Sequence, residues 1–434
     1  MPDHTLHTGT LAHLREDPRA AADALDIIPD GGLLVDASGH IAAIGPRARL
    51  HAEHPATPTI DHGADWLIPG LVDGHIHFPQ FYATAAPGGQ LLDWLQRSVY
   101  PAEAAFQDES FAARAAERFV GRLLAAGTTT ALVFGSQYYA ANCALFEQAR
   151  NSGLRLIAGM TLMDRNAPAE LLRSAEDAAL DMERLMALCA GESRLRYAVT
   201  PRWPMACSDA LLKLCGELVR DHPGCYLHTH INENGGEIAA VKSGFPGSRD
   251  YLDVYDRYGL VGPRTMLAHS IHSTDVELDR MAEAGCAVCH CPGSNLYLGS
   301  GLFPLRRHRA RGIRVAVGTD VGAGPQFSVW RELADAYKVQ QLQGEDIGAA
   351  ALLYLGTLGG AKALALEAET GNFAPGKSAD FWVLGYADDA YLCERLARCA
   401  SHEEQLFALL HLASPAHVRA TYAQGKLCPE AGHP

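Results

Sequence analysis

The chain has 434 residues, of which 48% are hydrophobic, and this is ample material for a large folded core. Its formal net charge of −14 repels a phosphate backbone, which argues against a nucleic-acid polymer as partner. The polar first residues lack the apolar segment of a signal peptide, and no run of about 18 apolar residues predicts a membrane span.

Short alternating segments separated by turns occupy the N-terminal flank, residues 9–68. The stretch from Gly32 to Gly45 alternates apolar and polar positions around a turn, which indicates a β-hairpin. Residues from about 371 onward repeat this character, for example between Gly371 and Leu384. We therefore predict that the two flanks are β-rich and pair with each other in one small domain.

Eight short apolar runs alternate with longer amphipathic stretches between the flanks. The runs are rich in β-branched or aromatic residues, which is typical of parallel strands buried on both faces. Amphipathic segments such as Glu170–Ala190, Ser208–Arg220 and Val276–Ala284 predict helices between them. Eight alternating units predict a closed (β/α)8 barrel. The predicted strands are Leu67–His77, Thr128–Phe134, Leu154–Leu162, Arg196–Arg202, Cys225–Ile231, Thr265–Ser270, Cys286–Pro292 and Arg314–Asp320.

Metal ligands are predicted where several of these strands end. His75 and His77 are two residues apart, so on a strand their imidazoles point to one face and can reach one ion. His230, His269 and Asp320 end the fifth, sixth and eighth predicted strands, on the face where barrel enzymes hold their active sites. Because burying such groups unpaired is costly, their convergence predicts a metal site. The set suits a catalytic Zn²⁺, and Fe²⁺ is the alternative.

Glu233 follows His230 by three residues and is the predicted proton shuttle. A carboxylate there can take a proton from activated water and return it to the substrate. The alternative role is a Glu favoured by the dipole at a helix N-terminus. Three nearby histidines are expected to have hydrogen-bonded structural roles instead of binding metal: His228, His272 and His290.

Three of the eleven cysteines lie close together, at Cys286, Cys289 and Cys291. A structural zinc site needs a second pair of ligands at suitable spacing, and none is evident. We interpret this segment as a buried strand in which cysteine is a small apolar residue. An odd number of cysteines without a leader predicts reduced thiols in a cytoplasmic protein.

Several of these segments resemble the amidohydrolase superfamily, namely Pro69–His77, the strand ends at His230 and His269, and Gly318–Asp320. Further segments resemble the guanine deaminase family within it, from about residue 69 to 376. The most specific are Gln80, Thr200–Arg202 and Ser294–Phe303. The complete set is Phe78–Gln80, Gly127–Gly135, Met163–Pro168, Thr200–Arg202, His228–Asn234 and Cys291–Phe303.

The resemblance implies a barrel joined to a small β-sandwich domain made from both termini. The expected division is 1–68 and 371–434 for the small domain and 69–370 for the barrel. The implied activity is hydrolysis of guanine to xanthine and ammonia by hydroxide that one zinc ion activates. A second metal in related barrels needs a lysine on the fourth strand, and that strand has none. Family members are often homodimers, so the same assembly is expected.

The resemblance also assigns roles to single residues. His75, His77, His230 and Asp320 would hold the zinc. Glu233 would shuttle protons, and His269 would contact the hydroxide or ligate weakly; both, with Asp320, are the expected catalytic residues. The residues expected to contact the purine are Gln80 and Arg202 at its edges, Trp203 against its ring, and also His230, Glu233 and Asp320.

The chain departs from the family pattern at two of the positions near these residues. Trp203 stands where Phe is expected, and Gly74 stands where Thr is usual. The larger Trp203 leaves a modified purine or a pterin open as the substrate, and cytosine is a further alternative for a deaminase of this superfamily. A hydrolase of cyclic amides, which usually needs two metals, and a non-catalytic binding protein are the competing functions. The intact set of predicted ligands and Glu233 argue against a non-catalytic role.

Overall fold

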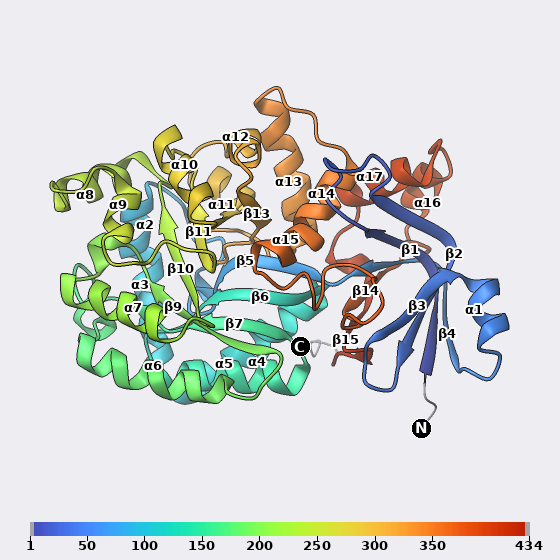
Figure 1. The fold of residues 1–434 in the computed structure, drawn as a ribbon, viewed down its shortest axis with the longest axis horizontal. Coiled ribbons are helices and arrows are strands. Elements are labelled where there is room, and N and C mark those ends of the chain that lie inside the picture. Colours follow the sequence, from blue (N-terminus) through green and yellow to red (C-terminus); the bar gives the residue numbers. More distant parts are fainter. Residues whose placement is uncertain (1–3, 430–434) are drawn as a thin grey trace.

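Two sheets of different kinds organise the structure, a computed structural model that describes residues 4–429 (Figure 1). A parallel barrel forms one side of the molecule and a smaller sheet the other. The smaller sheet has seven strands in the order β16-β15-β14-β4-β1-β2-β3 and combines both flanks of the chain, as predicted. Its strands are β1 (His4–Leu14), β2 (Leu25–Asp36), β3 (Ile41–Pro46), β4 (Thr59–Pro69), β14 (Phe381–Leu384), β15 (Val418–Ala423) and β16 (Lys426–Leu427).

The barrel follows the strand order β5-β6-β7-β9-β10-β11-β12-β13, with the short β8 paired to β9. All its pairings are parallel, which confirms the predicted architecture. The loop after β13 returns to β5, where Asp320 N donates to His75 O at 2.8 Å. The strands are β5 (Leu71–His77), β6 (Thr128–Phe134), β7 (Arg155–Gly159), β8 (Thr161–Leu162), β9 (Leu195–Pro201), β10 (Tyr226–Ile231), β11 (Thr265–His269), β12 (Ala287–His290) and β13 (Arg314–Val317).

Of the predicted strands, only Thr128–Phe134 has the limits found in the structure, and three others differ in ways that matter for the site. Leu67–His77 is two strands in different sheets, which separate at Gly70, where a Cβ would lie 1.9 Å from Thr129 Oγ1. Leu154–Leu162 is interrupted between β7 and β8. The eighth barrel strand ends at Val317, so Asp320 lies on the loop beyond it and not at the strand end.

Helices connect consecutive barrel strands and cover the barrel from outside (Figure 1). The three helices predicted by amphipathic pattern are confirmed as α6, α7 and α10, with shifted ends. Each begins after a Ser or Thr whose hydroxyl accepts a backbone N–H of the first turn, which explains where it starts. The covering helices include α4 (Glu109–Ala125), α5 (Tyr139–Ser152), α6 (Ala175–Cys189), α7 (Asp209–Asp221), α8 (Gly235–Gly244), α9 (Tyr251–Asp256), α10 (Asp275–Glu283), α12 (Leu305–Ala310), α13 (Val329–Leu342), α14 (Ala349–Gly356) and α15 (Leu358–Ala363).

Several short helices were not predicted from the sequence. The long connection from β5 to β6 contains α2 (Leu91–Trp94), a π-helix (Leu95–Val99) and α3 (Tyr100–Ala104), and α11 (Pro292–Tyr297) follows β12. In the C-terminal flank, α16 (Ala390–Leu396) and α17 (His402–Leu412) interrupt the β-structure. Trp330 Nε1 of α13 donates to Leu409 O of α17 at 3.0 Å, so this flank also packs on the barrel.

The seven strands of the small sheet form one continuous hydrogen-bonded order that encloses its own core. The register shifts around Gly9, where β1 meets both β2 and β4. Apolar side chains from both halves of this single sheet then meet in one buried cluster. The cluster comprises Leu11, Leu33, Val35, Ile41, Leu67, Phe373, Ala379, Phe381, Val383 and Tyr422. The division of the chain at residues 68 and 370 stays a prediction.

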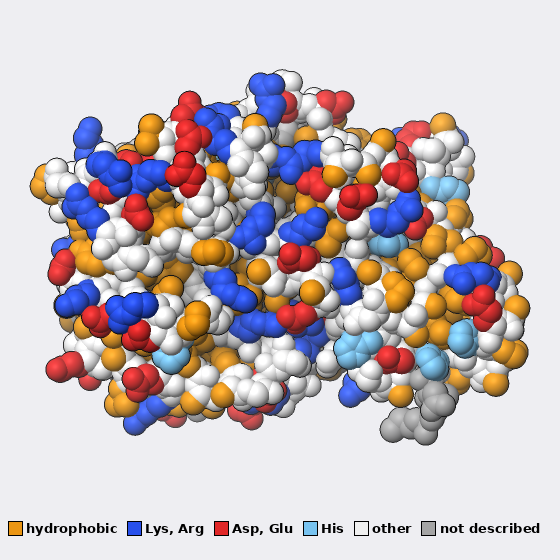
Figure 2. Space-filling model, in the orientation of Figure 1, with side chains coloured by type: hydrophobic (Ala, Val, Ile, Leu, Met, Phe, Trp, Pro, Cys, Tyr) orange, Lys and Arg blue, Asp and Glu red, His pale blue; other side chains and the backbone are white. Residues whose placement is uncertain are grey.

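The sequence argues against a nucleic-acid partner and against a membrane span, and the surface and the helices bear on these two points. On the face drawn in Figure 2, acidic and basic side chains are interspersed over both the barrel and the small sheet. The net charge of −14 is therefore not gathered into one acidic region on this face. Among residues 4–429, no helix is both long enough and apolar enough to cross a membrane.

A buried ion pair joins the small sheet to the barrel. Asp380, just before β14, pairs with Arg194 Nη2 at 3.1 Å, and its side chain is fully buried. Arg155 Nη2 lies 3.7 Å from the same carboxylate. Burial alone would raise the pKa of Asp380, but the two guanidinium groups lower it, so the carboxylate stays charged.

Replacing Asp380 by Ala is expected to lower the free energy of unfolding by about 3–5 kcal/mol, because the buried Arg194 loses its carboxylate partner and Arg155 keeps only Glu369. Denaturant titration measures the change. Glu192→Ala is the control: it removes a partner of Arg150 in a pair about 40% exposed on both sides, and should cost less than about 1 kcal/mol. The Asp380 contribution should be present above its unfolded pKa and be lost as pH falls through the lowered folded value. Equal losses in the two variants would contradict this reading.

Candidate functional site

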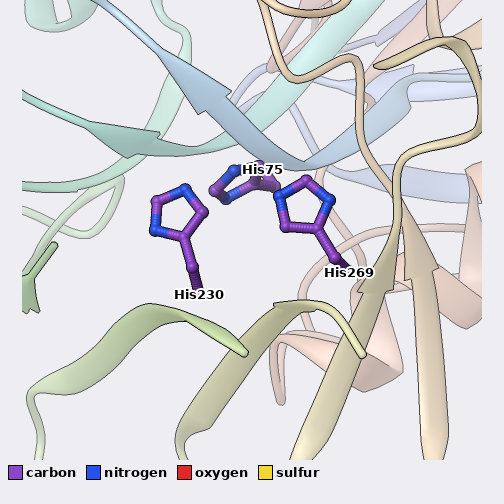
Figure 3. A group of neighbouring side chains, drawn as sticks. All are labelled: His75, His230 and His269. Carbon is purple, nitrogen blue, oxygen red and sulfur yellow. The ribbon is translucent and has the colours of Figure 1, made fainter. Parts of the chain in front are cut away.

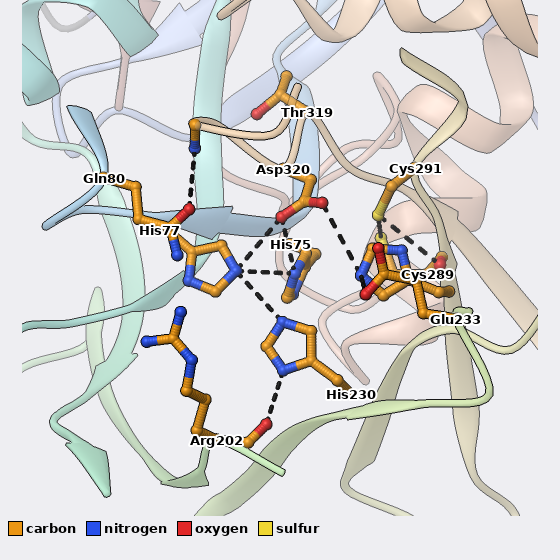
Figure 4. Close-up of polar contacts among 12 residues, drawn as sticks. His75, His77, Gln80, Arg202, His230, Glu233, Cys289, Cys291, Thr319 and Asp320 are labelled. Atoms are coloured by element: carbon orange, nitrogen blue, oxygen red, sulfur yellow. Dashed lines mark hydrogen bonds and ion pairs between the residues drawn. The ribbon is translucent and has the colours of Figure 1, made fainter. Parts of the chain in front are cut away.

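Five predicted side chains converge at the end of the barrel, as Figures 3 and 4 show. His77 Nε2 lies 3.2 Å from His75 Nε2 and 3.3 Å from His230 Nε2. Asp320 Oδ1 lies 3.1 and 3.2 Å from the Nε2 atoms of His75 and His77. His269 Nε2 completes the cluster, 3.8 Å from Asp320 Oδ2. The structure thus brings together all five side chains predicted at the metal site.

In three of these imidazoles, the Nδ1 atom faces away from the cluster and contacts a neighbouring group. His230 Nδ1 donates to the Arg202 carbonyl oxygen at 2.7 Å, which leaves Nε2 with a free lone pair. His269 Nδ1 lies 3.0 Å from Asn295 Oδ1, and His75 Nδ1 lies 2.7 Å from His228 Nε2. Such partners fix ring orientation in metal sites.

The cluster fits a divalent cation. A proton shared by two of the converging nitrogen and oxygen atoms cannot reach the others. The lone pairs of those other atoms therefore face one another without a hydrogen-bond donor between them. The ligand atoms of His75, His77 and Asp320, and likewise those of His75, His230 and His269, all lie within 4.8 Å of one another. Burial lowers the pKa of His77 to about 3 and that of His230 well below its usual value, which keeps both imidazoles in the neutral, metal-binding form.

Unusual backbone conformations place two of these side chains. His269 has φ 71° and Asp320 has φ 48°, in the left-handed region that non-glycine residues seldom adopt. Asp73, in the middle of β5, pins the second of these turns: its carboxylate accepts from Thr319 N at 3.1 Å and from Thr319 Oγ1 at 2.6 Å. The turn that carries Asp320 is therefore held against β5, next to His75 and His77.

Glu233 lies beside the cluster of predicted metal ligands but is not one of them. Its Oε2 lies 3.5 Å from His269 Nε2, and Ser300 Oγ donates to its Oε1 at 3.3 Å. Burial and the charge of Asp320 raise the pKa of Glu233, so the carboxyl can hold a proton near neutral pH. The loop is fixed by Glu237, which accepts from the backbone N–H of Glu233 at 2.9 Å and from Tyr251 at 2.5 Å. Glu233 thus precedes α8. Asn234 and Glu237 cap the N-terminus of that helix, and Glu233 does not.

A pocket opens over the cluster. It contains every residue predicted to contact substrate, and these come from different strand ends: Gln80, Arg202, Trp203, His230, Glu233 and Asp320. Leu91, Leu92, Trp94 and Leu95, from the unpredicted connection after β5, supply an apolar wall. The site therefore combines a polar floor with an apolar side, which is typical of a small-molecule site.

Glu103 of α3 was not singled out from the sequence. Its side chain is fully buried, and Arg202 Nη1 donates to both of its oxygens at 2.8 Å. Gln80 Nε2 donates to it at 3.2 Å and Gln137 Nε2 at 2.6 Å. Asn295 and Ser300 were also missed as single residues, although both lie inside the specific segment from Ser294 to Phe303.

The three histidines expected to be structural have different surroundings. His228 orients His75, and His272 Nε2 donates to Ser300 O at 2.8 Å, so both make the expected hydrogen bonds. His290 does not: neither ring nitrogen has a partner among the described residues, and the ring stacks on Phe303 with centroids 4.5 Å apart. The expectation of a hydrogen bond is wrong there because the site offers an aromatic face instead.

Cys291 lies nearer the metal cluster than the interpretation of its segment implied. Its Sγ lies within 4.8 Å of ligand atoms of His269 and Asp320. Burial raises the pKa of its thiol well above the usual value, which opposes the thiolate form that binds metals. Cys286 and Cys289 are also buried and free, in agreement with their interpretation as small apolar residues.

Comparison with known proteins gives a consistent result. The model of the amidohydrolase family matches residues 66–428. A probable guanine deaminase of Deinococcus radiodurans is 42% identical over 427 residues, 97% of each chain.

Two solved structures have the same fold over almost the whole length. The E. coli guanine deaminase has a TM-score of 0.93 at 37% identity, with 98% of both chains covered. A guanine deaminase from C. acetobutylicum with guanine bound in its active site has a TM-score of 0.89 at 27% identity, covering 98% of this chain and all of the other.

Proposed function

The chain belongs to the amidohydrolase family and, within it, to the guanine deaminases, and from this membership we propose that it hydrolyses guanine to xanthine and ammonia. The observation that carries the proposal is the cluster of imidazoles around Asp320, which shares one pocket with Gln80, Arg202 and Glu233.

The proposed metal is one Zn²⁺ per chain, held by His75, His77, His230 and Asp320, with Fe²⁺ as the alternative. Three imidazole nitrogens and one carboxylate oxygen with an open side are a donor set that catalytic zinc accepts. The fourth barrel strand, β9, has no lysine to bridge a second ion. When bound, the cation supplies a Lewis acid that lowers the pKa of water. His269, in the same cluster, is proposed to contact the attacking oxygen or to ligate weakly.

The reaction breaks the bond from C2 of guanine to its exocyclic nitrogen and forms a C2 carbonyl, with one water consumed. Glu233 is proposed to take a proton from the attacking water, to deliver it to the ring nitrogen beside C2, and to assist departure of ammonia. Its raised pKa and its place in the pocket support this role. Asp320 and His230, at the base of the pocket, are proposed to contact the same part of the substrate.

The far edge of the base is proposed to meet Gln80 and Arg202, with Trp203 against the ring. The edge of guanine at O6 and N7 offers two adjacent acceptors, which a guanidinium pairs with through two parallel hydrogen bonds. A Gln amide can both donate and accept along the remaining edge. All three side chains line the pocket, which supports the assignment.

Arg202→Lys is expected to raise the KM for guanine by about 10- to 100-fold, because lysine keeps the charge beside Glu103 but cannot form two parallel bonds. Bound metal and kcat should change much less. Steady-state kinetics with metal analysis measure the three quantities together. An unchanged KM would remove Arg202 from the binding site, and loss of metal would make its role structural.

Ammonia release from a panel of guanine, cytosine, adenine and pterin tests the proposed substrate. With metal-loaded protein, guanine is expected to be the best of the four. Trp203 makes this test necessary, because its large ring lines the pocket. Preference for pterin or cytosine would favour one of the alternative substrates, and release from none of the four would contradict the proposed deaminase.

A homodimer in the cytoplasm stays a prediction for this chain. Its support is the resemblance for the assembly and the eleven free cysteines for the compartment. Light scattering on the purified, metal-loaded protein measures the subunit number directly, and a monomer would contradict the predicted assembly.

A further inference from the structure

The Glu103 carboxylate is the centre of a buried hydrogen-bond network at the edge of the pocket. Its side chain has no exposed surface, yet it accepts four hydrogen bonds, two from Arg202 Nη1 and one each from Gln80 and Gln137. Arg202 and Gln80 line the pocket, whereas Glu103 does not. Figure 4 shows both the Arg202 guanidinium and the Gln80 amide near His77. Glu103 therefore acts on the pocket only through side chains that face it.

This network determines which atoms of Arg202 remain for a ligand. Nη1 is fully committed to Glu103. Among residues 4–429, no group accepts a hydrogen bond from Nε or Nη2 of Arg202. Neither nitrogen is fully buried, so both remain accessible. The guanidinium also lies over the Tyr100 ring, 5.5 Å from its centroid, so it is held on a second side. The fork that Nε and Nη2 of the Arg202 guanidinium form is thus left to donate to two adjacent acceptors of a ligand.

The same carboxylate determines how the Gln80 amide is turned. A carboxylate oxygen accepts hydrogen bonds and does not donate them, so the end of the amide that faces Glu103 is the nitrogen. The other end is consistent with this, because Gly322 N donates to Gln80 Oε1 at 3.4 Å. With Gln at position 103, the amide of Gln80 could turn over, because the new side chain both donates and accepts.

We propose that Glu103 is a positioning residue for substrate selectivity: it holds the Arg202 fork and the Gln80 amide in the one arrangement that recognises the O6 side of guanine. The inference rests on the proposed function and deepens it. The group recognised is a carbonyl oxygen with a neighbouring ring nitrogen on a purine that carries an amine at C2. A purely structural Glu103, which ties α3 to the barrel, would affect all substrates alike.

The test compares guanine with 2-aminopurine, which carries the reacting amine but has hydrogen in place of O6. Glu103→Gln is expected to raise the KM for guanine by about 10- to 100-fold, within the range for hydrogen bonds to charged groups. The kcat/KM for 2-aminopurine should fall much less, so the preference for guanine falls at least about 10-fold. Bound metal should stay at the wild-type level, because no metal ligand contacts Glu103 in this network.

Two further variants separate positioning from folding. Asp380→Asn changes another buried carboxylate that pairs with an arginine, outside the pocket, and should lower thermal stability without changing the preference. The double variant Glu103→Gln, Arg202→Gln removes both charges together, so no buried charge is left unpaired. Its loss of preference should be smaller than the sum of the losses in Glu103→Gln and Arg202→Gln, because both single variants disturb the same contact.

An equal loss of kcat/KM for both purines in Glu103→Gln would overturn the inference, as would an unchanged KM for guanine. Fully additive losses of preference in the double variant would also overturn it. No turnover of guanine by the metal-loaded wild-type protein would overturn the proposed function itself, and the inference with it, so the two failures are distinguishable.

Discussion

Glu233→Gln is expected to lower kcat for guanine by at least about 10²-fold while the protein keeps its metal. The amide has nearly the same shape but cannot take a proton from water or deliver one to the ring, and general acid–base groups contribute about 10²- to 10⁴-fold. Stopped assays for xanthine give the rate, and elemental analysis gives the metal content.

The position of Glu233 makes this variant a clean test. Its carboxylate lies 3.5 Å from His269 Nε2 and is not among the grouped ligand atoms. Its loop is held through Glu237 and Asn234, which the variant leaves in place. Near-normal turnover would exclude Glu233 from the mechanism, and loss of metal would show that the carboxylate is a ligand.

His75→Ala is expected to abolish activity through loss of the metal. His75 belongs to two of the three candidate ligand groups, so its removal takes one ligand from each of them. Changing a residue that only supports a ligand costs about 10- to 100-fold in metal affinity or activity, and removing a ligand should cost more. Treatment of the wild-type protein with a chelator should have the same effect, and added Zn²⁺ should restore activity only in the wild type.

His290→Ala is the matched control for the metal ligands. It removes another fully buried imidazole from the same end of the barrel, one that stacks on Phe303 and belongs to none of the candidate groups. It should keep the metal, with a loss of stability from the lost packing. Equal metal loss in both variants would contradict the assignment of His75 as a ligand.

The metal cluster was predictable because strand order alone brings its members together. Parallel strands in a barrel end on one face, so residues as distant as His75 and Asp320 become neighbours once eight βα units are recognised. The spacing of His75 and His77 added the shared face of a strand. The loop geometry was not predictable: Asp320 reaches the cluster through a left-handed turn that Asp73 fixes from β5.

The support around the cluster was harder to predict. Glu103 comes from a connection whose helices are only four or five residues long, too short to show a periodic pattern. Its partner Arg202 lies 99 residues away, and no local signal links them. Asn295 and Ser300 lay inside a segment specific to the family, but the roles of these two side chains depend on contacts with His269 and Glu233.

The C-terminal helices show a different limit. Ser401 caps α17 and two glutamates occupy its first turn, which are start signals present in the sequence. They lie in a flank whose β-like character from Gly371 onward dominated the interpretation. The same flank supplies β14, which pairs with β4 as expected, so the composition predicted the sheet and hid the helices beside it.

Hydrolysis of guanine in ¹⁸O-labelled water tests the central claim most directly. Metal-loaded protein should form one xanthine and one ammonia for each guanine consumed, with the label in the new C2 carbonyl, and metal-free protein should form neither. No xanthine from guanine with fully loaded protein, or xanthine without the label, would contradict hydrolytic deamination at this site.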